Sequence, residues 1–302
     1  MISEMVMAEV TAFMKSRVIL TAAELDLFTC LDEKPQMASS IARERGLDVR
    51  ATTRLLDYLC VMELLAKTDD IYRVTEKGCF LSSRHPETVL PMVLHMVHLW
   101  NTWSGLTETV RKGSGKQPES GLKFNEKDWK SFVDAMHVAA KVLSKAIAES
   151  YDASKFKRLL DVGAASGTYT ISFLQKNPLL KAIVFDLEDV IPMAKERIRE
   201  EGLSDRVEFV AGDFYEEELP KGCDLALLSA IIHQNGPDEN LRLYDKVFRA
   251  LEKGGTILIR DHIMNEDRTK PPAGALFAVN MLVNTHSGDT YIFREVKDGL
   301  ES

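Results

Sequence analysis

Cysteine is scarce in this chain, and long apolar runs are missing from it. The 302 residues include four cysteines that lie far apart and form no Cys-x-x-Cys pair: Cys30, Cys60, Cys79 and Cys223. This spacing favours free thiols in a reducing compartment over disulfides or a zinc site. No apolar run reaches about 18 residues, so we expect no membrane-spanning helix. The amino terminus lacks the basic start and apolar core of a signal peptide, so we expect a cytoplasmic protein.

An excess of positive charge is also missing. The formal net charge is −8 at pH 7, and this balance disfavours a nucleic-acid partner or an anionic membrane surface. Hydrophobic residues make up 45% of the chain, which is enough to build ordinary cores. The length suggests about two domains.

The first part of the chain has the pattern of a winged helix. Apolar residues recur at helical spacing over residues 5–20 and 22–32, and two further helices are predicted over 37–45 and 48–65, with a turn at Gly46. A short hairpin is predicted around residues 72–78. Residues 37–65 carry four basic and four acidic side chains, and the second helix is largely apolar. Because a helix that reads DNA needs a basic excess, we favour a packing or dimerisation module over DNA binding.

The middle of the chain is predicted to be helical on both sides of a polar, glycine-rich loop at residues 113–121. Trp100 and Trp103 lie three residues apart on one helical face, where they fit either a core or interface or the wall of a substrate pocket. The helix predicted over 128–150 contains Met136 and His137. We expect His137 to be a packing residue with a hydrogen-bond partner rather than a ligand.

The second half alternates between strands and helices. Apolar strands are predicted over 159–162, 182–186, 206–210, 224–229 and 256–261, with helices near 168–176, 189–201 and 237–252. This alternation predicts a parallel sheet with helices on both faces. Because such sheets bind ligands at the carboxyl ends of their strands, the polar residues there are the candidate site.

The first strand runs into a turn that begins at Gly163 and ends at Gly167. Glycine lets the backbone approach a ligand and leaves helix N–H groups pointing toward it. The turn lacks the Lys-Ser/Thr ending of a phosphate loop, and Ala165 breaks the dinucleotide fingerprint. Asp186 ends the second strand about twenty residues later, where an acid binds ribose hydroxyls. The alternative for Asp186 is a helix N-cap, and the two roles are compatible.

Two further strand ends carry candidate chemistry. Asp213 follows the third strand and is placed to accept from an adenine amino group, with Phe214 against the ring; a simple turn is the structural alternative. His233 lies four residues after Ser229, at the end of the fourth strand. A neutral imidazole there is the best general-base candidate in the chain, and the alternative is a loop histidine without a task.

Taken together, these residues resemble the winged-helix family of S-adenosylmethionine-dependent small-molecule O-methyltransferases. The resemblance covers nearly the whole chain and rests on residues 99–103, 132–136, 161–163, 185–187, 212–214, 232–233, 237–239, 254–255 and 288–290. It implies an α/β fold, with a Rossmann-like class I methyltransferase sheet and an N-terminal, mostly α winged-helix dimerisation domain. The implied ranges are 1–112 for the dimerisation domain, 113–150 for a loop and connecting helix, and 151–302 for the catalytic domain.

The resemblance also implies the roles of individual residues. It implies that S-adenosylmethionine, which becomes S-adenosylhomocysteine, is held by Asp161, Gly163, Gly167, Asp186, Leu187, Gly212, Asp213, Phe214 and Ser229. It implies that His233 takes the proton from the acceptor hydroxyl, with the acids Asp261 and Asp289 beside it. The acceptor, a small molecule that we expect to be aromatic, is implied to lie near Trp103, Met136, Met281 and Asn284. A homodimer through the N-terminal domain is implied, and no metal is expected because no convincing ligand spacing is visible.

Several positions depart from the family pattern. Gln234-Asn235 stand where Asp-Trp is usual, Ser229 stands where Lys or Arg is common, and Ala165 replaces a glycine. The family's closing antiparallel strand pair is not found after residues 294–300, so the 256–261 strand is expected to be an exposed edge, and we favour a shortened chain. The departures leave open N-methylation or decarboxylation with the same cofactor. A winged-helix regulator that senses a ligand is the alternative outside enzymes.

Overall fold

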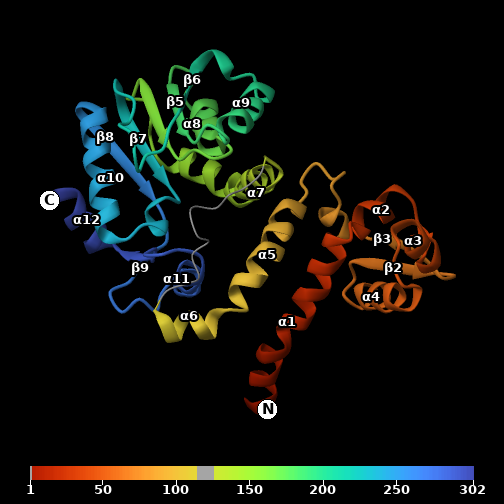
Figure 1. Ribbon diagram of the computed structural model, residues 1–302. Coiled ribbons are helices and arrows are strands. Elements are labelled where there is room, and N and C mark those ends of the chain that lie inside the picture. Colours follow the sequence, from red (N-terminus) through yellow and green to blue (C-terminus); the bar gives the residue numbers. More distant parts are fainter. Residues whose placement is uncertain (1, 114–125) are drawn as a thin grey trace. The chain divides into compact units, whose positions relative to one another are not determined.

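The computed structural model describes residues 2–113 and 126–302 (Figure 1). The chain forms two compact units, Met1–Leu99 and Trp100–Ser302. These units are defined by contacts within the fold, so the domain boundaries expected at residues 112 and 150 remain predictions. In the described part of the chain, no helix is both long and apolar enough to cross a bilayer.

The first unit is a helical domain with a small antiparallel sheet in the strand order β1-β3-β2. This arrangement matches the predicted winged helix. The second helix of the pair is shorter than expected, because residues 65–68 leave it and pair with Ile71–Val74. Its elements are α1 (Ile2–Glu24), α2 (Leu27–Glu33), β1 (Gln36–Met37), α3 (Ala38–Arg45), α4 (Val49–Val61), β2 (Leu65–Thr68), β3 (Ile71–Val74) and η1 (Gly78–Leu81).

The apolar face of α4 packs into the core of this unit. Leu56 and Leu59 are fully buried, together with Phe28 and Ile41. Burying such side chains stabilises a fold by about 1.5–3 kcal/mol each. The face of α4 that the sequence marked as apolar therefore serves packing.

The second unit contains the parallel sheet that the alternation predicted. The strand order is β6-β5-β4-β7-β8, and all four pairings are parallel. The helices that precede and flank the sheet are α5 (Leu90–Trp103, which crosses the division between the units), α6 (Leu106–Lys112), α7 (Glu126–Ser150), α8 (Thr168–Lys176), α9 (Ile191–Glu200), α10 (Pro237–Ala250), α11 (Pro272–Asn284) and α12 (Phe293–Glu301). The strands and short helices are β4 (Arg158–Val162), β5 (Lys181–Asp186), η2 (Ser204–Arg206), β6 (Val207–Ala211), β7 (Cys223–Ser229), η3 (Ile232–Gln234), β8 (Leu251–Arg260), β9 (Ile263–Met264) and β10 (Tyr291–Ile292).

Successive strand residues point to opposite sides of the sheet, so both of its faces carry apolar side chains. Helices cover each face. Leu159, Val184 and Leu225 pack with the helices α7, α8 and α9 on one face. Leu160 and Ala226 pack with α10 and α12 on the other (Figure 1). β8 lies at one edge of the sheet, as the sequence led us to expect.

Two short strands enclose α11. β9 and β10 pair in parallel, with Tyr291 opposite Ile263 and Ile292 opposite Met264. The chain between them leaves the end of the sheet, forms α11 and returns to its starting point. This arrangement places α11 beside the residues that follow β8.

Candidate active site

The turn between β4 and α8 is built for close backbone approach. Gly163 and Gly167 have φ angles of 67° and 69°, in the left-handed region that favours glycine. A Cβ at Gly163 would lie 2.4 Å from Cδ1 of Ile231, so a side chain there would displace Ile231 as well as strain the backbone. Ala165 adopts φ 48° in the same turn. A left-handed alanine costs about 1–2 kcal/mol, so the surrounding contacts must hold this turn in place.

Asp186 supplies one of those contacts. Its carboxylate accepts hydrogen bonds from the amides of Ala165 and Leu187, each at 2.7 Å. The helix after β5 begins only at Ile191, with Val190 as its N-cap residue. Asp186 therefore does not cap that helix, and its carboxylate faces the glycine turn instead.

Asp161 lies behind the turn and is almost fully buried. Its Oδ2 accepts a hydrogen bond of 2.6 Å from the hydroxyl of Thr170. Burial raises the pKa of Asp161 to about 6, and the nearby charge of Asp186 adds to the rise against the opposing Thr170 bond. Burial likewise raises the pKa of Asp186 to about 6, although the hydrogen bonds from the amides of Ala165 and Leu187 lower it. Both groups are therefore anionic at neutral pH at an energetic cost.

The loop after β6 lies against the same turn. Phe214 Cε1 is 3.6 Å from the position of a Cβ at Gly163, and Gly212 is so close to the ring of Phe185 that a Cβ would lie 2.8 Å from it. Asp213 accepts from the amide of Tyr215 at 2.8 Å. The strand ends of β4, β5 and β6 thus meet at one edge of the sheet.

Lys246 of α10 fixes this loop. Its ammonium donates to the backbone carbonyls of Phe214, Tyr215 and Glu217 at 2.8, 2.9 and 2.8 Å. Three charge-assisted bonds to one short segment hold its backbone firmly. This contact could not be predicted from local sequence patterns, because Lys246 lies about thirty positions from its partners.

His233 and Asp261 form a hydrogen-bonded pair between η3 and the end of β8. Nδ1 of His233 lies 2.8 Å from Oδ1 of Asp261, which also accepts from the amide of His262 at 2.8 Å. Burial alone would raise the pKa of Asp261. The hydrogen bond from the His233 ring, the charge of His233 and the hydrogen bonds from the amides of His262 and His233 outweigh this effect, so the pKa of Asp261 lies below its usual range.

The ionised Asp261 settles which nitrogen of His233 carries the proton. A carboxylate only accepts, so Nδ1–H must donate to it. Nε2 is then left with its lone pair for a partner. The ring of Phe277 meets that of His233 edge-on, with centroids 4.8 Å apart, and so limits its rotation.

The other predicted catalytic acid, Asp289, is placed differently. Its carboxylate lies 3.7 Å from the guanidinium of Arg268 and is about half exposed. Within the described residues, no hydrogen bond or ion pair joins Asp289 to the His233 ring. The chain nevertheless passes close by, since a Cβ at Gly288 would lie 2.5 Å from the carbonyl oxygen of His233.

The predicted acceptor residues come together in part, around an asparagine that the sequence did not single out. Trp103 Nε1 donates to Oδ1 of Asn280 at 2.9 Å. Asn284 Nδ2 donates to the carbonyl and to Oδ1 of Asn280, at 2.9 and 3.0 Å. Met281 is buried beside them on α11. Only the four-residue spacing of Asn280 and Asn284 on one helix could have indicated the pair.

Met136, the last predicted acceptor residue, is half-buried on α7. Its neighbour His137 is a packing residue with a partner, as expected: Nδ1 lies 2.8 Å from the hydroxyl of Thr168 at the start of α8. Burial lowers the pKa of His137 to about 4, so the ring is neutral there.

Comparison with known proteins agrees with this arrangement. Residues 103–297 match the O-methyltransferase domain, and residues 7–83 match the O-methyltransferase dimerisation domain. The chain belongs to the O-methyltransferase family. It is therefore an enzyme, and the sheet and its flanking helices form the catalytic fold of that family.

Several methyltransferases are similar to this O-methyltransferase over most of its length. The tetracenomycin polyketide synthesis 8-O-methyl transferase TcmO of Streptomyces glaucescens is 29% identical over 93% of this chain and 84% of its own. The 3-hydroxy-5-methyl-1-naphthoate 3-O-methyltransferase of Streptomyces sahachiroi is 29% identical over 96% and 86%. The structure of human N-acetylserotonin methyltransferase in complex with SAM superposes with a TM-score of 0.87, at 24% identity, over 100% and 91%.

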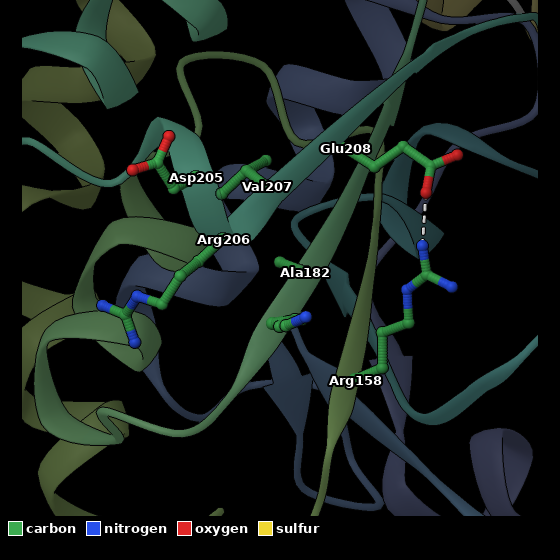
Figure 2. A pocket seen from close by; sticks show the side chains of 7 residues that line it. Arg158, Ala182, Asp205, Arg206, Val207 and Glu208 are labelled. Carbon is green, nitrogen blue, oxygen red and sulfur yellow. Dashed lines mark hydrogen bonds and ion pairs between the residues drawn. The ribbon is translucent and has the colours of Figure 1, made fainter.

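A pocket at the opposite end of the sheet does not suit the family's chemistry. It is lined by Arg158, Lys181, Ala182, Asp205, Arg206, Val207 and Glu208, at the amino ends of β4, β5 and β6 (Figure 2). Arg158 is paired with Glu208, and Arg206 donates to backbone carbonyls. These cations already have structural partners.

Metal ligands are not gathered in the described part of this O-methyltransferase. Over residues 2–113 and 126–302, no three histidine, cysteine or acidic side chains are arranged to hold an ion. The four cysteines are free thiols in this structure.

Proposed function

We propose that this O-methyltransferase transfers a methyl group from S-adenosylmethionine to a hydroxyl of a small aromatic molecule, with His233 as the general base. The observation that carries the proposal is the His233–Asp261 pair. It lies at the carboxyl edge of the sheet, where the glycine turn and the carboxylate of Asp186 also lie. A base and a nucleoside site at one edge are what methyl transfer to a hydroxyl requires.

The residues at this edge fit S-adenosylmethionine. Asp186 and Asp213 offer carboxylates to ribose hydroxyls and to an adenine amino group, with Phe214 against the ring. The buried hydroxyl of Ser229 has no partner among the described residues, so it suits a polar ligand group. The remaining residues of the proposed cofactor site shape the turn and its surroundings: Asp161, Gly163, Gly167, Leu187 and Gly212.

When bound, S-adenosylmethionine supplies a methyl group that its sulfonium already activates. The protein must therefore position the acceptor hydroxyl and increase its nucleophilicity. Nε2 of His233 takes the hydroxyl proton, while Asp261 holds Nδ1–H and stabilises the imidazolium that results. Removal of a proton by a positioned base accelerates such steps by about 10²–10⁴-fold. Asp289 is proposed as a second acid near His233, in reach only if its ion pair with Arg268 opens.

The acceptor side is proposed to bind a neutral aromatic molecule through two amides. The indole of Trp103 can only donate, so Asn280 must present Oδ1 to it. Asn284 presents Nδ2 to a backbone carbonyl. Among the described residues, no partner is found for Nδ2 of Asn280 or Oδ1 of Asn284, which leaves one donor and one acceptor. With Phe277 one turn away on α11 and Met136 and Met281 as apolar wall, this set suits a hydroxylated ring that carries a further polar group.

The N-terminal unit is proposed to form a homodimer. Val6, Val10, Phe13 and Met14 lie at helical spacing on α1, and each is more than half exposed. An exposed apolar stripe on a helix is an interaction surface. Because the matched family domain is a dimerisation domain, a second copy of this chain is the proposed partner.

Calorimetry with S-adenosylhomocysteine tests the cofactor assignment, and failure of the intact protein to bind would remove it. Turnover of an acceptor found from a panel of phenols and amines then tests the chemistry. His233→Gln should lower kcat by about 10²–10⁴-fold with unchanged S-adenosylhomocysteine affinity. His286→Gln, at an exposed position, is the matched control. Wild-type turnover in His233→Gln would refute the base, and methylated amines instead of ethers would change the reaction class.

A further inference from the structure

Asn235 follows the short helix η3 that carries His233, and it is completely buried. Its side-chain and main-chain polar groups are used. The hydroxyl of Tyr215 donates to its Oδ1, its Nδ2 donates to Oδ1 of Asn240 at 3.0 Å, and the hydroxyl of Tyr291 donates to its carbonyl. Four separate segments of the second unit therefore meet at this one residue.

The orientation of both amides follows from a fixed partner. Asn240 Nδ2 lies 3.0 Å from the carbonyl of Ile232, which can only accept. Oδ1 of Asn240 therefore faces Asn235, and Nδ2 of Asn235 donates a hydrogen bond to it. Oδ1 of Asn235 is then the acceptor for Tyr215. Because Ile232 belongs to η3, the hydrogen bonds of Asn235 and Asn240 together stabilise the turn that contains His233.

Tyr215 comes from the loop after β6, next to Phe214. Its residue is 48% exposed, yet its hydroxyl reaches inward to Asn235. The backbone of the same loop is held by Lys246 of α10, through the three carbonyl bonds already described. Tyr215 is thus a direct side-chain link between the loop proposed to receive adenine and the turn that carries His233.

We propose that Asn235 is a positioning residue that ties the base turn, Ile232–Gln234, to the adenine loop, residues 212–217. This inference rests on the proposed function. This link fixes the position of the His233 imidazole relative to the proposed nucleoside site, and methyl transfer between two bound molecules requires such fixed positions. The bond from Tyr215 requires an acceptor at position 235, and Oδ1 of Asn235 supplies it.

Tyr215→Phe tests the tie with little disturbance, because the ring is half exposed and only one hydroxyl is removed. Hydrogen exchange is measured by mass spectrometry with and without S-adenosylhomocysteine. In the wild type, the ligand should slow exchange in both segments, 212–217 and 232–236. In Tyr215→Phe, the slowing at 232–236 should fall by at least about threefold, the size expected for one lost hydrogen bond, while that at 212–217 persists.

Tyr291→Phe is the matched control, since it removes the other tyrosine hydroxyl on Asn235 without touching the loop. It should lower thermal stability yet keep ligand-induced slowing in both segments. Wild-type slowing at 232–236 in Tyr215→Phe would overturn the tie, and so would equal losses in the two variants. Absence of S-adenosylhomocysteine binding by the wild type would instead defeat the proposed function.

Discussion

At the scale of single residues, the carboxylate of Asp261 accepts three hydrogen bonds. The ring and amide of His233 and the amide of His262 all donate to it, at 2.8, 3.3 and 2.8 Å. These donors keep the carboxylate ionised and select the tautomer of His233. The chemistry of the imidazole is thus set by a residue that need not touch the substrate.

Asp261→Asn should lower kcat by about 10²-fold or more, because an amide can donate to Nδ1 and so favour the wrong tautomer. Thermal stability should fall modestly, because the NH2 group of the asparagine must face a backbone N–H that donates to Asp261 in the wild type. The kinetics are therefore compared at a temperature where both proteins are folded, and S-adenosylhomocysteine affinity should stay near wild type. Steady-state kinetics at saturating cofactor provide the measurement. A kcat within threefold of wild type would contradict the tautomer argument.

Asp161 provides a prediction about pH. A folded-state pKa of about 6 lies above the usual value of 3.8, so this group favours the folded state below pH 4, and that contribution is lost as pH rises to 6. Asp161→Asn cannot ionise and still accepts from Thr170. Its gain in unfolding free energy over wild type should grow from near zero at pH 4 to about 2–3 kcal/mol above pH 6. Denaturant unfolding at several pH values measures this difference, and a gain independent of pH would refute the shift.

At the scale of elements, α11 carries the residues proposed to bind the acceptor. Phe277 contacts the ring of His233, while Asn280 bonds to Trp103 and Asn284. Leu276, which precedes Phe277, is 62% exposed. One short helix therefore packs against the His233 ring and also carries the amides proposed to bind the acceptor.

Asn280→Leu should raise the KM for the acceptor about tenfold, with a smaller change in kcat, because it removes binding groups distant from the reacting atoms. Leu276→Ala, at an exposed position of the same helix, serves as control and should leave both constants near wild type. The comparison requires only initial rates over a range of acceptor concentrations. Equal effects of the two variants would show that α11 acts through stability alone.

The elements themselves were largely predictable, because apolar periodicity and glycine positions are local. The strand that ends at Asp186 and the turn at Gly163 can each be predicted from about ten consecutive residues. The Trp103–Asn280 bond joins positions 177 residues apart, and no local pattern reports it. The same holds for Lys246 and for Asn235, whose partners come from separate segments. Tertiary contacts of this kind decide how the site is held, and the sequence alone left them open.

At the scale of the whole molecule, association through the first unit is the main expectation. Val10 and Phe13 lie on the exposed stripe of α1 and make no contribution to the buried core of that unit. Burying two such side chains at an interface typically contributes several kcal/mol.

The double change Val10→Glu and Phe13→Glu should convert a dimer to a monomer with an unaltered circular dichroism spectrum. Charges on that stripe would have to lose water on association, which is costly. Light scattering coupled to gel filtration gives the mass directly. As a control, Val142→Glu alters a still more exposed apolar residue of α7 and should preserve the dimer. A dimer that survives the double change would place the interface elsewhere.

The parallel pairing of β9 with β10 has a practical consequence. Because the chain leaves and re-enters the body of the second unit at adjacent points, we predict that residues 265–290 can be exchanged as one segment if the contacts of Phe277 with His233 and of Ser287 with Glu239 are kept. Grafting the corresponding stretch from TcmO, with the two short strands retained as seams, offers a route to chimeras that accept other ring systems. Such exchanges would leave the nucleoside end of the enzyme untouched.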